Sequence, residues 1–93
     1  MNNRELYKTI VRSVLERYIR QSADGKLEVF YFGDVLHAAG NKYWSQEHPE
    51  TSIFNDAHVV DEVLREFDEK LEIYPGWFGG YRARQRGIEG AQG

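Results

Sequence analysis

The sequence predicts a small α+β domain with three helices, one short strand and a C-terminal β-hairpin. The strongest evidence is an apolar face at helical spacing, formed by Val59, Val60, Val63, Leu64 and Phe67. Leu71–Tyr74 then alternates as a strand does, and turn residues follow at Pro75-Gly76 and Gly79-Gly80. Residues 81–84 can return as the partner strand. We therefore expect a helix, with Asp56 as its N-cap, that runs directly into a hairpin.

Length and composition predict one globular domain. The 93 residues are 41% hydrophobic and 14% aromatic, which favours a packed core. The chain has no cysteine, so it forms no disulfide, thiolate zinc site or cysteine nucleophile. It also lacks a long apolar run and a signal-peptide pattern, so we expect a cytoplasmic protein and no membrane partner. Residues 1–86 are predicted to form the domain, and 87–93, with three glycines, a disordered tail.

The net charge of −3 is unevenly distributed along the chain. Residues 1–26 carry +3, residues 27–80 carry −8 and residues 81–93 carry +2. The basic face of the first helix comprises Arg4, Lys8, Arg12 and Arg20. We interpret it as a solvated face, or as one that pairs with the acidic middle of another molecule.

The first helix is predicted at Glu5–Arg20, where a broad apolar face lies opposite charged residues. Turn residues end it, and Gly25 can supply a positive φ. Lys26–Phe32 is rich in aromatic residues and is predicted as a short strand.

A second, shorter helix is predicted after this strand. Gly33-Asp34 opens it, Val35–Ala39 forms it and Gly40 ends it. Asn41–Phe54 is the least periodic part of the chain and is long for a connector. We expect either a helical turn near Ser45–His48 or a functional loop.

This order of elements resembles the winged helix-turn-helix domains over residues 4–84. The stretch F-G-D-V-L-H-A-A-G is similar to the first helix of the turn-helix pair. The stretch V-V-D-E-V-L-R-E-F-D-E-K-L-E-I-Y-P-G-W is similar to a second helix that leads into the wing. The connection 41–55 is longer than a tight turn, and the second helix is acidic. The resemblance implies a small regulatory protein that binds either DNA or other proteins.

DNA binding is the first hypothesis, because the resemblance would place the helix 57–70 in the major groove. Asn55 and His58 at its start could read base edges, although a turn residue and a solvent-facing histidine are the alternatives. Arg82, Arg84 and Arg86 alternate and could grip phosphates or a narrow minor groove. The non-core residues of the helix carry a charge of −3, which opposes binding to DNA.

A protein-interaction module is the second hypothesis. Its acidic helix would meet a basic partner, and exposed aromatic residues would serve as anchors. The residues concerned are Asp61, Glu62, Glu66, Trp77, Phe78, Tyr43 and Trp44. Trp77 and Phe78 can alternatively fold back onto the core. Opposite charges on one chain would also permit self-association, including a homodimer.

An enzyme is not expected. The three histidines are 11 and 10 residues apart, which is not the helical spacing of metal ligands. Gly76, Gly79 and Gly80 lack the Lys-Ser/Thr of a phosphate loop, and Ser45 lacks the glycines of a nucleophile elbow. We therefore predict no catalytic residues, no cofactor and no metal.

Overall fold

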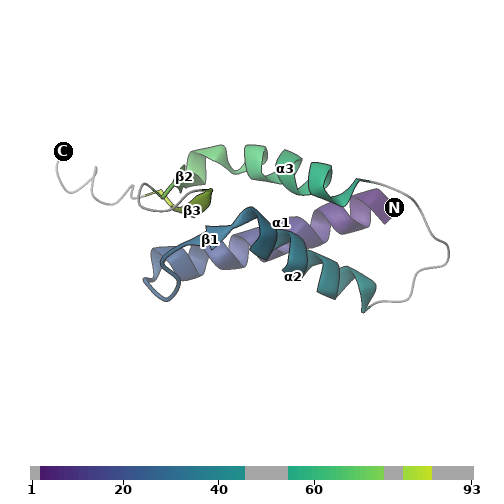
Figure 1. The fold of residues 1–93 in the computed structure, drawn as a ribbon, viewed down its shortest axis with the longest axis horizontal. Helices are drawn as coiled ribbons and strands as arrows, with labels where there is room; N and C mark the ends of the chain where they lie inside the picture. The colour runs from purple at the N-terminus through teal and green to yellow at the C-terminus, as the bar shows by residue number, and fades with distance from the viewer. Residues whose placement is uncertain (1–2, 46–54, 75–78, 85–93) are drawn as a thin grey trace.

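The part of the chain that the structure describes folds into three helices and a three-stranded antiparallel sheet (Figure 1). The computed structural model describes residues 3–45, 55–74 and 79–84, so the tail predicted at 87–93 lies outside the described residues. The elements are α1 (Asn3–Ala23), β1 (Phe30–Tyr31), α2 (Phe32–Trp44), α3 (Asp56–Glu66), the 3-10 turn η1 (Asp68–Lys70), β2 (Leu71–Ile73) and β3 (Gly80–Ala83). The predicted fold class is confirmed.

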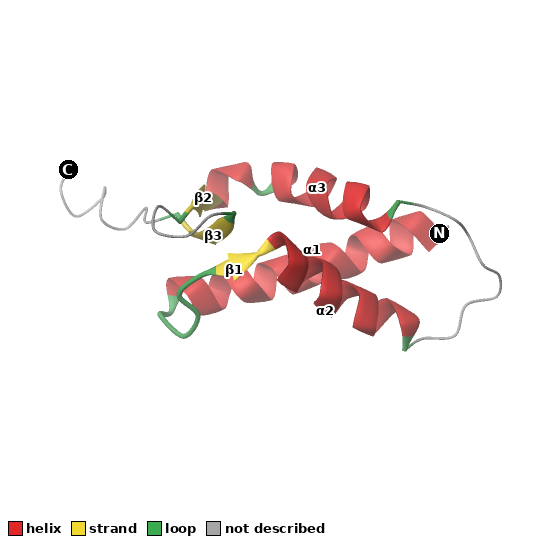
Figure 2. Cartoon of the chain, in the orientation of Figure 1, coloured by secondary structure: helices red, strands yellow, loops and turns green. Residues whose placement is uncertain are grey.

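The sheet has the order β1-β3-β2, so the last strand lies in its centre (Figure 2). Leu71 pairs with Ala83 in the C-terminal hairpin, and Phe30 pairs with Tyr81 on the other side. The predicted hairpin is confirmed to within one residue at each strand.

The core lies where α1 meets α2, α3 and the sheet. Its fully buried members come from the three helices and from β1: Tyr7, Val11 and Leu15 of α1, Phe30 of β1, Val35 and Ala39 of α2, and Val59, Val60 and Val63 of α3. The Phe30 ring lies 5.4 Å from the Tyr18 ring and 6.0 Å from the Tyr81 ring, centroid to centroid. The helical face predicted from Val59, Val60, Val63 and Leu64 is therefore buried, with Phe67 partly so.

The chain leaves α1 through a glycine-dependent helix end. The Lys26 amide donates to the Gln21 carbonyl and the Gly25 amide to the Ser22 carbonyl, while Gly25 adopts a φ of +79°. This confirms the positive φ predicted for Gly25. The helix is longer than the predicted Glu5–Arg20. The predicted strand Lys26–Phe32 shrinks to Phe30–Tyr31, because its first amides complete the helix end.

The predicted end of the second helix at Gly40 is wrong, because α2 continues to Trp44. Val35, Ala39 and Tyr43 recur every four residues and are buried, so the last turn is held by the core. Burying a large aromatic side chain outweighs the roughly 1 kcal/mol that a glycine costs inside a helix. Residues 41–44, predicted to be irregular, are therefore helical, and 46–54 lie outside the described residues.

The cap of α3 is Asn55 and not Asp56. The Asn55 side-chain oxygen accepts a hydrogen bond from the His58 amide at 3.0 Å, which is the geometry of an N-cap. The helix ends at Glu66, short of the predicted Lys70, and η1 takes its place. The Lys70 carbonyl accepts the Arg84 amide at 2.9 Å, so the chain has already turned into the hairpin there.

Candidate functional site

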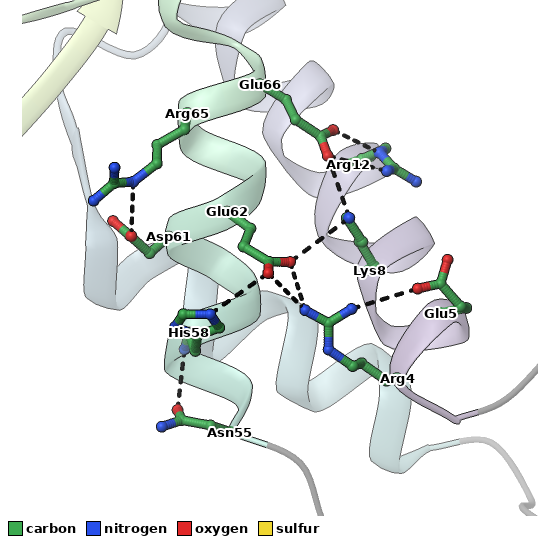
Figure 3. A network of polar contacts seen from close by, with 10 residues as sticks. All are labelled: Arg4, Glu5, Lys8, Arg12, Asn55, His58, Asp61, Glu62, Arg65 and Glu66. Atoms are coloured by element: carbon green, nitrogen blue, oxygen red, sulfur yellow. Dashed lines mark hydrogen bonds and ion pairs between the residues drawn. The ribbon is translucent and has the colours of Figure 1, made fainter.

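A ladder of ion pairs joins α1 to α3 (Figure 3). The two helices run in the same direction, so residues four apart on each can meet (Figure 1). The ladder consists of Arg4, Lys8 and Arg12 on α1 and Glu62 and Glu66 on α3. Arg4 contacts both oxygens of Glu62, at 2.6 and 2.7 Å, and Arg12 contacts both oxygens of Glu66, at 2.9 and 3.2 Å. Lys8 lies between the two carboxylates, at 3.6 and 3.4 Å.

These contacts set the charge state of the two glutamates. The hydrogen bond from Arg4 holds the pKa of Glu62 below the usual range, and the hydrogen bond from Arg12 does the same for Glu66. The sequence suggested that the basic face of the first helix is solvated or pairs with another molecule. For Arg4, Lys8 and Arg12 the pairing is instead intramolecular, because α1 and α3 pack side by side.

The remaining polar residues of α3 also have contacts within the protein. Asp61 accepts a hydrogen bond from Arg65, one turn later on the same helix, at 2.9 Å. Asn55 is used as the N-cap, and His58 is 62% exposed at its side chain and lies 3.5 Å from Glu62. Of the residues predicted to read DNA bases, Asn55 therefore has a structural role and His58 faces solvent.

The hairpin arginines bind to their own hairpin and its surroundings. Arg82 donates to Glu72 at 2.8 Å and lies over the Tyr74 ring, 5.0 Å from its centroid. Arg84 donates to the backbone carbonyls of Leu71 and Asp68, at 2.7 and 3.3 Å. Arg86, Trp77 and Phe78 lie outside the described residues.

The neighbouring aromatic residues at the end of α2 have opposite environments. Tyr43 is 2% exposed and packs edge-on against the Tyr7 ring at 5.5 Å. The expectation that Tyr43 offers an exposed anchor is therefore wrong, because helical geometry turns it into the core. Trp44 is 66% exposed, and its ring rests edge-on against that of Tyr43 at 4.8 Å.

A shallow groove of about 370 Å³ runs along the outer face of α2. It is lined by Gly33, Leu36, His37, Gly40, Asn41 and Trp44. These positions recur at helical spacing, so they form one stripe on the helix. The glycines give the stripe two places without a side chain, and the Trp44 indole stands at its end.

The sequence reasoning missed this groove, apart from Trp44. Local rules place Gly33 and Gly40 at the start and the end of a short helix, and so do not predict that the two glycines share one helix face. The available signal was the continued apolar period through Val35, Ala39 and Tyr43, which places both glycines inside the helix.

Metal sites and membrane spans were also sought in the part of the chain that the structure describes. Among these residues, no group of three or more His, Asp or Glu side chains could hold a metal ion. None of the helices there combines the length and apolar character that a membrane span needs. Comparison with protein-family models, curated proteins and solved structures finds no match for this chain.

Proposed function

We propose that the protein is a non-enzymatic interaction domain, cytoplasmic and winged-helix-like, that binds a protein partner through the groove on α2. The observation that carries this proposal is the exposed Trp44 at the end of an uncharged, glycine-lined stripe. Tryptophan is among the residues most enriched at the energetic centres of protein interfaces. A helix face of this kind suits an apolar helix or strand of a partner.

The charge distribution supports the α2 groove over the acidic helix as the binding surface. Glu62 and Glu66 already bind cations of α1, and Asp61 binds Arg65. A basic partner would have to displace these internal cations before it gained their carboxylates. The groove of α2 requires no such exchange, since it has no formal charge with His37 neutral.

DNA binding is the second candidate, and the order of elements favours it. The exposed His58 at the start of α3 and the arginines of the hairpin would be its contacts. Against it, residues 56–70 carry six carboxylates and two cations, and duplex DNA repels such a surface. Arg82 and Arg84 would also have to leave their present partners to reach phosphates.

Site-specific photo-crosslinking tests the interaction proposal. A benzophenone amino acid at His37, in the groove, is expected to capture a partner in cells, whereas the same group at Lys42 on α2 should not. Lys42 is a matched control because it is exposed on the same helix but does not line the groove. The captured protein is then purified and its binding measured; Trp44→Ala should weaken it at least tenfold, about 1.4 kcal/mol.

Fluorescence anisotropy with mixed-sequence duplex DNA separates the two candidates. The interaction proposal expects no binding at about 50 mM salt, where non-specific binding is strong. Binding that weakens steeply by about 200 mM salt, and that is lost in Arg82→Ala/Arg84→Ala, would instead support DNA binding.

A further inference from the structure

We infer that the occupant of the α2 groove is the same groove of a second copy of this chain, with the two α2 helices packed antiparallel across a two-fold axis. This inference rests on the proposed function, because it names the partner of the same surface. It is carried by the shape of the groove, by its charge and by the area it offers.

The groove is complementary to itself when the axis passes between Ala38 and Ala39. Residue 44 of one copy then faces residue 33 of the other, and residue 37 faces residue 40. The exposed Trp44 ring therefore meets Gly33 of the second copy, and His37 meets Gly40. Each large side chain finds a position that lacks one, which is how closely packed helices fit together.

No neighbour in the described part of the chain explains why these two positions are glycine. A Cβ at Gly33 would meet no described atom within 4 Å, and a Cβ at Gly40 would meet only the Trp44 side chain at 3.9 Å, an ordinary contact. Gly40 nevertheless lies in the interior of α2, where a glycine destabilises a helix by roughly 1 kcal/mol relative to alanine. A local rule broken without an internal reason points to a contact outside the molecule.

The electrostatics favour a second copy arranged in this way. The chain has a net charge of −3, so two copies repel each other on average, whereas the groove has no formal charge with His37 neutral. Asp34 and Asn41 lie seven residues apart and so share one flank of α2. The two-fold axis brings Asp34 of each copy near Asn41 of the other, where the amide can donate to the carboxylate. Antiparallel helices also oppose their dipoles.

The area of the groove predicts a weak dimer. Thirteen helical residues span about 20 Å, so one helix face on each side buries less than the ~1,200 Å² of a stable complex. We therefore expect a concentration-dependent dimer with a dissociation constant of about 10 µM to 1 mM.

Sedimentation equilibrium of the full chain from about 10 µM to 1 mM tests this expectation. The unmodified protein should pass from monomer to dimer, and Trp44→Ala and Gly33→Leu should each raise the dissociation constant at least tenfold. Gly33→Leu keeps the test independent of folding, because its site is open and leucine favours helix. Ile73→Ala is the control, since it removes the other large exposed apolar side chain and should leave the dimer unchanged.

Single cysteines test the orientation, because the chain has none of its own. In the antiparallel pair the two copies of residue 37 are offset by about 4.5 Å along the helix, within reach of a disulfide. The two copies of residue 33 are offset by about 16 Å, well beyond it. Mild oxidation should therefore link His37→Cys into a covalent dimer and leave Gly33→Cys monomeric.

Three results would overturn the inference. They are a monomer throughout the concentration range, a dimer that Trp44→Ala and Gly33→Leu do not weaken, and efficient linkage of Gly33→Cys, which the proposed antiparallel register excludes. The proposed function is judged separately by the photo-crosslinker at residue 37. Capture of a different protein there, with a monomeric chain, rejects the dimer and keeps the interaction domain, whereas a monomeric chain that captures nothing rejects both.

Discussion

The α1–α3 interface and the outer face of α2 differ in whether their side chains are paired within the molecule. Between α1 and α3, five charged side chains at the edge of the core form a ladder in which every carboxylate contacts two cations of α1. On α2, the groove contains two glycines and an exposed tryptophan but no ion pair among its described residues. The charged groups of the first region pair with each other within the molecule, whereas the second region exposes the Trp44 side chain to water.

This difference shows that the most charged segment need not be the binding surface. Exposed charges are stable in water or with each other, and exposed ion pairs contribute little to stability. An exposed indole gains free energy only when another surface covers it. This contrast supports the groove on α2, and not the acidic helix α3, as the proposed binding surface.

The largest effect on stability is expected from Tyr43, which is buried in the core, and it is best compared with Trp44, the exposed residue next to it. Tyr43→Ala should lower the free energy of unfolding by about 3–5 kcal/mol, because it empties a buried site. Trp44→Ala should lower it by about 1 kcal/mol, since Trp44 is already 66% exposed to water. Urea denaturation measures both values. Equal losses would mean that Trp44 belongs to the core and that the groove is not a free surface.

Replacing three glycines by alanine, one at a time, should change the stability of the monomer by an intermediate amount, with a different sign in the helix than in the turn. Gly40→Ala should stabilise the monomer by about 0.5–1 kcal/mol, because the site is open and lies inside the helix, and Gly33→Ala should stabilise it by less, because Gly33 is in the first turn. Gly25→Ala should destabilise it by about 1 kcal/mol, since its φ of +79° strains other residues. Thermal unfolding at low protein concentration compares the three. Destabilisation by Gly33→Ala would show that the glycine is needed inside the monomer.

The smallest effect on stability is expected from removing the carboxylates of the ion-pair ladder, and this effect should depend on pH. The pKa values of Glu62 and Glu66 are lowered in the folded protein, so their contribution is present above the usual glutamate pKa of about 4.3 and is lost as pH falls through the folded values. Glu62→Gln/Glu66→Gln should therefore lower the melting temperature at pH 7, less so in high salt, and should match the unmodified protein in strong acid.

A control variant isolates the link between the helices. Asp61→Asn removes a carboxylate that pairs with Arg65, one turn later on α3 itself, so its effect should be smaller than that of the double variant. A loss that persists unchanged in acid would assign the effect of the double variant to packing and not to charge.

Much of the fold could be predicted from local patterns. The face of α3, the hairpin at residues 71–83 and the positive φ of Gly25 each depend on neighbours close in sequence. The end of α2 could not be predicted, because Gly40 is a helix terminator by local rules and only the burial of Tyr43 overrides it. The cap of α3 is predicted one residue too late, at Asp56, because it and its neighbour Asn55 both favour the cap position.

Some features of the candidate site could likewise be predicted from the sequence, and others could not. The sequence by itself determined the helical faces, the uneven charge and the presence of Trp44, because periodicity and composition are local properties. Tertiary structure decided that α1 and α3 neutralise each other, that Tyr43 is buried and that Gly33 and Gly40 line one groove. The physical reason is that pairing and burial depend on which segments pack together, and packing is set by the whole core and not by any one stretch of the chain.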